Sequence, residues 1–223
     1  MFQPLYLLRD LGHYNGELLE KGCCNLFHHV ATIRKSGIVP VVCINHFYTD
    51  TDEEVKLVRK LSEEAGALTA LSKHWQFGGE GAEELAEAVE EAAKRPNNFK
   101  FFNDDSQPIR DRVMAVAKEV YGAGDIEFLP AAQEKLELYQ NDPEISKLHV
   151  CMVKTHLSLS HDPDVKGRPT GFTLPIRDIL LYRGAGFIVP VAGDIKLMPG
   201  TGSDPAYRRI DIDVETGRIH GLF

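Results

Sequence analysis

Two aromatic side chains stand where the sequence predicts strands to end, and their faces could hold a flat heterocycle. Phe47 follows the apolar run at residues 38–44, and Trp75, the only tryptophan, follows the apolar run at residues 67–72. In an open α/β sheet, the loops that follow parallel strands form the ligand crevice. Stacking on such a ring contributes about 0.5–1.5 kcal/mol beyond the area that it buries. Spacing alone leaves open the alternative that both rings cap the end of the core.

A glycine-rich loop at residues 78–81 precedes a predicted helix, and the free N–H groups of a helix N-terminus can bind an anion. The loop lacks the Lys-Ser/Thr ending of a P-loop, and its Glu80 would repel a phosphate group. No G-x-x-x-x-G-K-S/T segment occurs in the sequence. We therefore expect the loop to cap the helix, and we expect that the isolated chain does not hydrolyse ATP.

Polar side chains elsewhere allow both structural and functional interpretations. Lys154 closes an apolar run, so its ammonium group is expected at a sheet edge, where it could form a structural pair or bind an anion. The turn-rich loop Met198-Pro199-Gly200 contains a glycine that would allow close approach of the backbone to a ligand. Other polar residues stand in a loop or on an expected edge hairpin: His156, His161, Asp162, Asp211 and Asp213. The first three lack the second spaced pair of a zinc site, so no metal is predicted, and the two aspartates are expected to face solvent.

The composition is that of an ordinary globular protein. Of the 223 residues, 43% are hydrophobic and 26% are charged, so one large domain or two small ones can form a core. The net charge of −8 argues against nucleic acid or an anionic membrane as the main partner. The four cysteines contain no C-x-x-C pair, and we expect reduced, partly buried thiols. We recognise neither a signal peptide nor a run of about 20 apolar residues, and we expect a cytoplasmic location.

Apolar spacing and turn residues predict an α/β fold, with a parallel-sheet segment followed by a smaller α+β domain. Helices are predicted at residues 16–36, 52–65, 82–94, 106–121 and 130–141, and strands at residues 38–44, 67–72 and 149–154. Two hairpins are predicted, one from residues 172–182 and 187–191 and one from residues 210–214 and 218–222. Helical crossovers between the first strands require parallel pairing. The pattern changes near residue 96, which predicts domains at residues 16–96 and 97–223.

The order of several motifs resembles the C-terminal part of formate–tetrahydrofolate ligase, also called formyltetrahydrofolate synthetase. These motifs are Leu19-Glu20-Lys21-Gly22, the I-N-x-F-x-x-D-T core within residues 41–51, His74-Trp75 to Gly81, residues 154–161 and 173–178, Met198-Pro199-Gly200, and residues 210–223. The resemblance begins near Glu17 and leaves residues 1–15 unmatched. Residues 154–177 are most similar to the eukaryotic multifunctional folate enzymes.

The resemblance implies a P-loop-type fold and the ATP-dependent joining of formate to tetrahydrofolate through formyl phosphate. It implies that Phe47 and Trp75 hold the pterin ring of tetrahydrofolate. It also places further residues in a possible cleft: Asn45, Lys154, Met198, Pro199 and Gly200. ATP and Mg²⁺ are implied as well, but the P-loop of the family lies upstream, so the phosphate site is absent from this chain. The family's Leu-Pro after Met-Pro-Gly is replaced here by Thr201-Gly202.

These motifs predict the folate-side portion of such a ligase, which would need an N-terminal ligase half for activity; its catalytic residues stay unassigned. Two alternatives stay open, namely a non-catalytic folate-binding or regulatory module and a truncated, inactive gene product. The run at residues 38–44 is expected to form a strand buried on both faces, yet too few partner strands are predicted to cover it. An exposed apolar edge is therefore expected to bind the missing half or a second copy of the chain.

Overall fold

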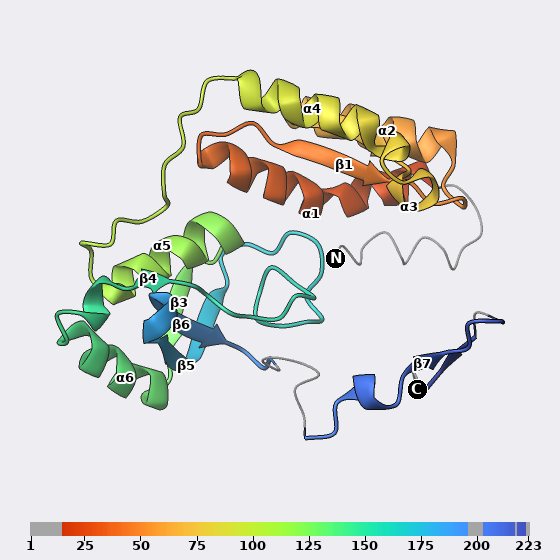
Figure 1. Ribbon diagram of the computed structural model, residues 1–223. Helices are drawn as coiled ribbons and strands as arrows, with labels where there is room; N and C mark the ends of the chain where they lie inside the picture. The colour runs from red at the N-terminus through yellow and green to blue at the C-terminus, as the bar shows by residue number, and fades with distance from the viewer. Residues whose placement is uncertain (1–14, 196–202, 217, 222–223) are drawn as a thin grey trace. The chain divides into compact units, whose positions relative to one another are not determined.

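A computed structural model describes residues 15–195, 203–216 and 218–221 (Figure 1). The chain divides into two compact units, Met1–Gly193 and Asp194–Phe223. The larger unit contains a pair of parallel strands and a four-stranded mixed sheet, so the predicted α/β class is confirmed. The domain boundary near residue 96 stays a prediction. Among the described residues, no helix combines the length and the apolar character that crossing a membrane requires.

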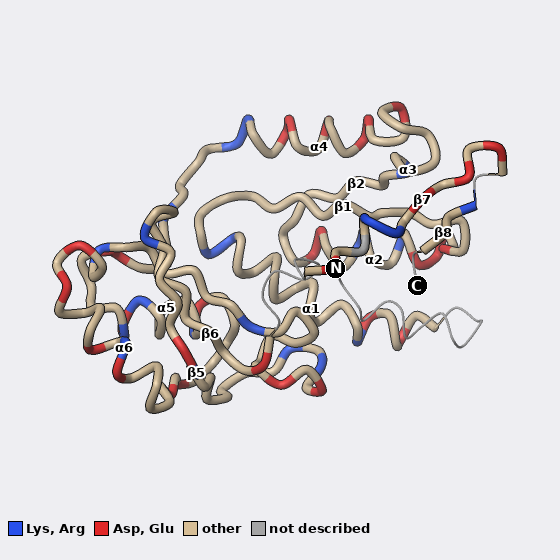
Figure 2. The backbone as a smooth tube through the Cα atoms, turned by 60° about the horizontal axis from the view of Figure 1, so that its bottom comes forward, with Lys and Arg blue, Asp and Glu red and all other residues tan. Residues whose placement is uncertain are grey.

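The first part of the larger unit alternates helices and strands, as the sequence predicts. Its elements are α1 (Gly16–Lys35), β1 (Val41–Asn45), α2 (Asp52–Glu64), β2 (Leu68–Ser72), the single turn α3 (His74–Phe77), η2 (Glu80–Ala82) and α4 (Glu83–Lys94). β1 and β2 pair in parallel, from Val41 opposite Leu68 to Asn45 opposite Ser72. Two views agree that β1 lies between α1 on one side and α4 on the other (Figures 1 and 2). The crossover through α2 allows the parallel pairing.

Local signals fix where these helices begin and end. The Thr51 hydroxyl accepts a hydrogen bond from Glu54 N at 3.2 Å, and the Glu54 carboxylate accepts one from Thr51 N at 2.8 Å. This capping box satisfies N–H groups that the start of α2 would otherwise leave free. α1 ends before Gly37, which has a φ of 87° that only glycine adopts readily. A Cβ at position 37 would lie 2.0 Å from the carbonyl oxygen of Asn98, so a larger residue would push these two segments apart.

β1 is less buried than the sequence predicts. The strand expected at residues 38–44 begins only at Val41, and Ile38 is 39% exposed. The apolar residues of β1 are half-buried and Cys43 is exposed, so the prediction of burial on both faces is wrong for the described fold. In the part of the chain that the structure describes, β1 pairs with β2 alone, and its other edge carries no strand. The four cysteines are free, with Cys23 buried, Cys24 half-buried, and Cys43 and Cys151 exposed.

The second part of the larger unit combines two longer helices with a four-stranded sheet. Its elements are α5 (Ile109–Tyr121), β3 (Asp125–Phe128), α6 (Pro130–Gln140), η3 (Ile145–Lys147), β4 (His149–Val150), β5 (Thr173–Tyr182), η4 (Arg183–Ala185) and β6 (Phe187–Ala192). The strand order is β3-β5-β6-β4, with β5 and β6 antiparallel and the two outer pairs parallel. The predicted hairpin of β5 and β6 is confirmed. β3 escaped prediction because it has only four residues, and Asp125 and Glu127 alternate with its apolar positions.

The core of this sheet depends on an irregularity in β5. Alternate residues of a strand face the same side of a sheet. Leu174 and Ile176 follow this rule and are fully buried, but the next fully buried residue is Ile179, three positions further on. A register shift between Ile176 and Asp178 changes the alternation of inward and outward side chains by one residue, so that Ile179 faces the core. The apolar face of α5 packs against the same buried cluster.

α1 also contacts the second part of the larger unit. The Nε2 atom of His28 lies 2.7 Å from the carbonyl oxygen of Val120, at the end of α5. The side-chain amide of Asn25 donates a hydrogen bond to the carbonyl oxygen of Gly167 at 3.0 Å. The segments on either side of the predicted boundary near residue 96 therefore share an interface.

A buried arginine organises the chain around β4. Arg112 on α5 is fully buried and donates hydrogen bonds to the carbonyl oxygens of Leu148, at 2.7 Å, and Ser146. Its Nη1 atom lies 3.6 Å from one carboxylate oxygen of Asp105, and the other oxygen lies 2.8 Å from Nδ1 of His149. Burial lowers the pKa of the Arg112 guanidinium, and the charge of Asp105 opposes that shift. Asp105 therefore compensates a positive charge that has no access to water.

The smaller unit contains η5 (Ala206–Arg208) and an antiparallel hairpin of β7 (Asp211–Ile212) and β8 (Ile219–His220). The carboxylate of Asp213 accepts hydrogen bonds from the backbone N–H groups of Glu215 and Thr216, at 2.9 and 3.1 Å. These bonds fix the turn between the strands. The predicted C-terminal hairpin is confirmed in shorter form, and Asp211 and Asp213 are exposed.

Replacing Asp105 with alanine should destabilise the chain. The change leaves the buried guanidinium of Arg112 with carbonyl acceptors but no counter-charge. Because the Asp105 side chain is 42% exposed, we expect a loss of about 1–2 kcal/mol, below the cost of breaking a fully buried pair. Urea unfolding measures the change. Asp164→Ala, at an exposed loop position, is the matched control, and an equal effect of the two substitutions would contradict this role of Asp105.

Candidate functional site

The parallel pairing of β1 and β2 brings the two aromatic loops to one sheet edge. Asn45 and Ser72 are opposite each other at the ends of the strands, and His46 N donates a hydrogen bond to Ser72 O at 2.9 Å. Immediately beyond this bond, the rings of Phe47 and Trp75 stack with their centroids 6.1 Å apart and their planes at 29°. The structure therefore brings together the two residues that the sequence singled out. Their role in ligand binding stays a prediction.

A tight turn positions Phe47. Asp50 N donates a hydrogen bond to the Phe47 carbonyl oxygen at 3.0 Å, and Phe47 N donates one to a carboxylate oxygen of Asp50 at 2.8 Å. The turn leads directly to Thr51, the N-cap of α2. Sequence reasoning overlooked Asp50 as a site residue. The available signal was an aspartate three residues after the aromatic, a spacing that lets a carboxylate reach back to a free backbone N–H group.

Trp75 lies on the single helical turn α3 and is 52% exposed. Its indole N–H donates a hydrogen bond to the carbonyl oxygen of His46 at 2.8 Å. This bond holds the Trp75 ring next to His46, the residue that precedes Phe47. The neighbouring His74 is held by a 2.9 Å hydrogen bond between its Nδ1 atom and the Ser72 hydroxyl.

The glycine-rich loop closes this edge of the sheet. Lys73 N donates a hydrogen bond to the Gly81 carbonyl oxygen at 2.8 Å. A Cβ on Gly81 would lie 2.5 Å from the Lys73 carbonyl oxygen, so glycine is required for this close approach. The loop leads through η2 into α4, whose N-cap, Ala82, makes no side-chain capping bond. The loop therefore positions the Trp75 segment, whereas the capping of α4 that the sequence predicted is not provided by a side chain.

The other predicted cleft residues occupy different surroundings. Asn45 is exposed at the end of β1, two residues before Phe47. Lys154 lies in the second part of the larger unit, where its ammonium group donates hydrogen bonds to the carbonyl oxygens of Thr155, at 2.9 Å, and Ser158, and lies 4.9 Å from the centre of the Tyr121 ring. Burial lowers the pKa of Lys154 to about 8. Met198, Pro199 and Gly200 lie outside the described residues.

The loop that follows Lys154 is ordered by its own hydroxyl groups. Ser158 and Ser160 lie 3.0 Å apart through their hydroxyl oxygens, and the Ser160 hydroxyl also accepts a hydrogen bond from Asp162 N at 3.1 Å. The buried Nδ1 atom of His161 makes no hydrogen bond. Within the ranges that the structure covers, no three histidine, cysteine or acidic side chains converge as a metal site would require.

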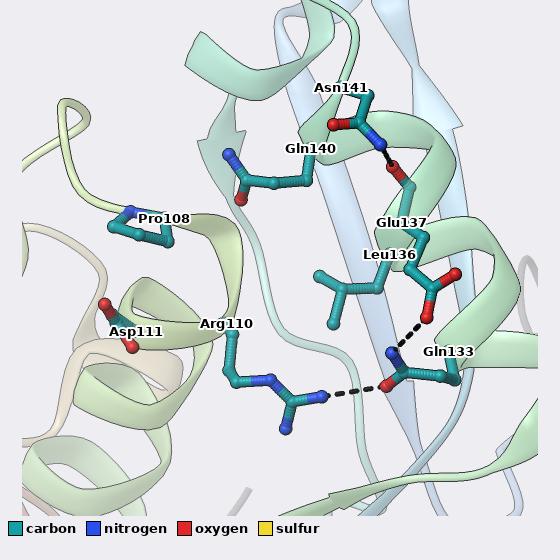
Figure 3. A pocket seen from close by; sticks show the side chains of 8 residues that line it. All are labelled: Pro108, Arg110, Asp111, Gln133, Leu136, Glu137, Gln140 and Asn141. Atoms are coloured by element: carbon teal, nitrogen blue, oxygen red, sulfur yellow. Dashed lines mark hydrogen bonds between the residues drawn. The ribbon is translucent and has the colours of Figure 1, made fainter.

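A cavity of about 430 Å³ lies between the start of α5 and α6 (Figure 3). It is lined by Pro108, Arg110, Asp111, Gln133, Leu136, Glu137, Gln140 and Asn141. Arg110 donates a hydrogen bond to Gln133, and Gln133 donates one to Glu137, each at 2.8 Å. Three of the polar side chains in its wall therefore bind one another. None of the predicted site residues lines this cavity, so the aromatic pair is the better candidate site.

Comparisons with known proteins agree on one family. A family model described as formate–tetrahydrofolate ligase matches residues 6–223, so the match starts earlier than the motifs near Glu17 indicated. A formate–tetrahydrofolate ligase of Desulfotalea psychrophila is 58% identical over 205 residues, which cover 92% of this chain and 37% of the relative. The relative in Dehalococcoides mccartyi strain CBDB1 is 55% identical, with coverage of 94% and 35%, and that in Lawsonia intracellularis is 53% identical, with coverage of 97% and 37%. The chain thus spans little more than a third of the length of these curated relatives.

The stability of the chain should depend on pH through Lys154. Burial lowers the folded-state pKa of Lys154 to about 8, below the ordinary lysine value of about 10.4, so between these pH values the unfolded chain binds more protons. Stability from this residue therefore rises as the pH rises. We expect the difference in unfolding free energy between the wild type and Lys154→Met to grow in favour of the wild type between about pH 8 and pH 10.

Urea unfolding at a series of pH values measures this difference. Lys60→Met, on the exposed side of α2, controls for the loss of one positive charge. A difference that stays constant or shrinks over the range would show that Lys154 is not buried as described.

Proposed function

The chain belongs to the formate–tetrahydrofolate ligase family, and from that premise we propose that it forms the folate-side portion of such a ligase. In this proposal, Phe47 and Trp75 hold the pterin ring of tetrahydrofolate. The observation that carries the proposal is the stacked pair at the edge of two parallel strands. Such an edge is the usual ligand crevice of an open α/β sheet. The proposal extends to a P-loop-type fold for the complete protein, a domain division near residue 96 and a cytoplasmic location.

The binding chemistry that the loops offer is stacking with fixed polar atoms nearby. A reduced pterin presents a flat pyrimidine face and several hydrogen-bonding groups at its edge. The rings of Phe47 and Trp75 supply apolar faces, and the exposed side chain of Asn45 at the end of β1 can donate and accept hydrogen bonds at the ring edge. We also propose Lys154 and the loop Met198-Pro199-Gly200 as cleft residues of the complete enzyme.

The complete reaction needs groups beyond those in this chain. We propose that formate is activated by ATP as formyl phosphate, and that the folate nitrogen then attacks it. Phosphoryl transfer requires a cradle for the phosphates and Mg²⁺. The sequence has no P-loop, and the described residues bring together no set of side chains that fits a metal ion. We therefore assign this step to a second part of the ligase and derive none of it from the residues of this chain.

The free edge of β1 is the proposed contact for that second part. β1 pairs with β2 on one side, and among the residues with a described position no strand covers the other side. Beside it, a shallow apolar groove of about 330 Å³ includes Ile38, Val41 and Val89. An open edge with apolar neighbours favours the addition of another strand. A strand from the N-terminal ligase half is the proposed occupant, and a second copy of the chain is the alternative outcome.

The aromatic pair should determine folate affinity. Removing one stacking partner by Phe47→Ala should weaken tetrahydrofolate binding by about 1–3 kcal/mol, or about 5- to 150-fold in Kd, using base–aromatic stacking as the analogue. Quenching of Trp75, the only tryptophan, reports binding to the wild type and to this variant, and calorimetry reports binding when Trp75 itself is replaced.

Tyr48→Ala is the matched control, because Tyr48 is an adjacent aromatic residue that is 84% exposed. It should bind tetrahydrofolate as the wild type does. Unchanged affinity in the double variant Phe47→Ala, Trp75→Ala would exclude the pair as the folate site.

The isolated chain should bind tetrahydrofolate without turning it over. Electrostatic stabilisation of a transferring phosphoryl group contributes orders of magnitude in rate, and the sequence contains no P-loop motif. We expect formate-dependent ADP release to appear only after addition of the N-terminal remainder of a relative, such as the Desulfotalea psychrophila ligase. Release by the chain alone at about 1–10³ per second would contradict the assignment. Folate binding that no added partner converts to turnover would instead favour a non-catalytic binding module, and the absence of both would favour an inactive product.

A further inference from the structure

We propose that the peptide group between His46 and Phe47 holds the Trp75 ring beside the backbone of Phe47, and that Asp50 is the positioning residue that fixes this peptide. In this arrangement the Trp75 ring stays in place, and the Phe47 ring moves when a flat ligand enters. The inference rests on the proposed function, because it assumes that a pterin binds between the two rings. It adds the way in which the chain holds the Trp75 ring and the Phe47 backbone in place.

Both polar atoms of this one peptide group are bound by side chains. Its carbonyl oxygen, from His46, accepts the hydrogen bond of the Trp75 indole at 2.8 Å. Its N–H group, from Phe47, donates to the Asp50 carboxylate at 2.8 Å. A peptide group is planar, so restraining its two ends restrains the orientation of the whole plane. Both rings are attached to this plane, Phe47 by a covalent bond and Trp75 by a hydrogen bond.

The peptide is in turn anchored to the sheet. His46 N donates to Ser72 O at 2.9 Å, which extends the pairing of β1 and β2 by one bond. Asp50 N donates to Phe47 O at 3.0 Å and closes the turn from the other side. The site therefore has a continuous series of hydrogen bonds, from the end of β2 through His46 and Phe47 to the start of α2.

Trp75 needs this support because its own element is small. α3 has four residues, and no side chain caps its start. The Trp75 side chain is 52% exposed, so packing alone does not fix the ring. The bond from its indole nitrogen to His46 O is therefore the contact that defines where the ring lies relative to Phe47.

The observed spacing of the Phe47 and Trp75 rings requires one ring to move when a flat ligand enters. Carbon atoms in contact lie about 3.5 Å apart at closest favourable approach, so a flat ring held between two others needs about 7 Å between them. The ring centroids of Phe47 and Trp75 are 6.1 Å apart and their planes are inclined by 29°. A ligand must therefore widen the gap. A shift of Trp75 would break the hydrogen bond from its indole to His46 O, so we assign the movement to the Phe47 side chain.

The fixing of the His46–Phe47 peptide by Asp50 can be tested first without ligand. The chain has one tryptophan, so a ¹⁵N-labelled sample gives one indole N–H signal. Asp50→Ala should release the peptide and raise the hydrogen-exchange rate of that indole about 2- to 10-fold, the factor that one net hydrogen bond represents. Asp50→Asn keeps an acceptor oxygen and should restore slow exchange. Asp52→Ala, which removes an exposed carboxylate from the first turn of α2, is the matched control and should leave the rate unchanged.

Tetrahydrofolate binding provides the second test. Asp50→Ala should raise the Kd by about 2- to 10-fold, and Asp50→Asn should return it to within about 2-fold of the wild type. Replacing Trp75 with 3-benzothienylalanine keeps the bicyclic ring but removes the N–H donor, and should raise the Kd by a similar factor. When that replacement is combined with Asp50→Ala, the loss of binding free energy should be smaller than the sum of the losses from the two single changes. Both changes act on the same peptide.

The outcomes separate this inference from the proposed function. If the wild type and Phe47→Ala bind tetrahydrofolate equally, the folate assignment fails, while the indole exchange rates still report whether Asp50 fixes the peptide. If Phe47→Ala weakens binding, but Asp50→Ala changes neither Kd nor indole exchange and the benzothienyl replacement leaves Kd unchanged, the folate site stands and the positioning role of Asp50 is overturned. Weaker binding and faster indole exchange in Asp50→Ala, with recovery of both in Asp50→Asn, support the positioning role of Asp50. A general loss of stability would also be seen in Asp52→Ala.

Discussion

The candidate site depends on the parallel direction of β1 and β2. Because both strands run the same way, the chain leaves Asn45 and Ser72 at the same edge of the sheet, and the two aromatic loops begin as neighbours. An antiparallel pair would send these loops to opposite ends of five-residue strands, roughly 16 Å apart at about 3.3 Å per residue. Only a crossover such as α2 allows the parallel arrangement. The capping box that starts α2 is therefore part of what places Phe47 beside Trp75.

The same strand pair is incomplete in a way that bears on function. Two strands alone form a marginal sheet, and the exposure of Cys43 on β1 shows that the described residues leave part of it uncovered. The family relatives are nearly three times as long as the matched region, which covers 37% of the Desulfotalea psychrophila ligase. Under the proposal that an N-terminal half adds strands to β1, the uncovered edge of β1 and the lack of a P-loop motif in this sequence would have one cause. Folding of the sheet and completion of the active site would then be coupled, because a single docking event supplies both.

The parts of this structure that could be predicted from sequence are those set by local signals. The helix limits followed from Thr51, Glu54 and Gly37, and the placement of the aromatic pair followed from turn residues after two apolar runs. The burial of residues 38–44 was predicted wrongly because an apolar run is typical of a strand in a complete sheet, whereas the described residues supply one neighbour. The binding of Lys154 to two carbonyl groups of its own loop could not be predicted, because it depends on how residues 155–168 fold back. Asp50 was overlooked because its carboxylate acts on a backbone N–H group, so the one available signal was its spacing three residues after Phe47.

Binding and turnover of a folate place different demands on a protein, and under the proposed function the described residues of this chain serve only the first. Stacking is short-ranged and needs two ring faces that lie side by side, which one strand pair and its loops can supply. Activation of formate needs charges arranged around a phosphate, and those must be fixed before the reaction begins. The two demands can therefore be divided between separate parts of a polypeptide, with the ring site retaining its geometry through the His46–Phe47 peptide and Asp50. Under the proposed function, such a site would keep its affinity for the flat part of the substrate without the phosphate-binding part, because the Trp75–His46 and Phe47–Asp50 hydrogen bonds both lie within this chain.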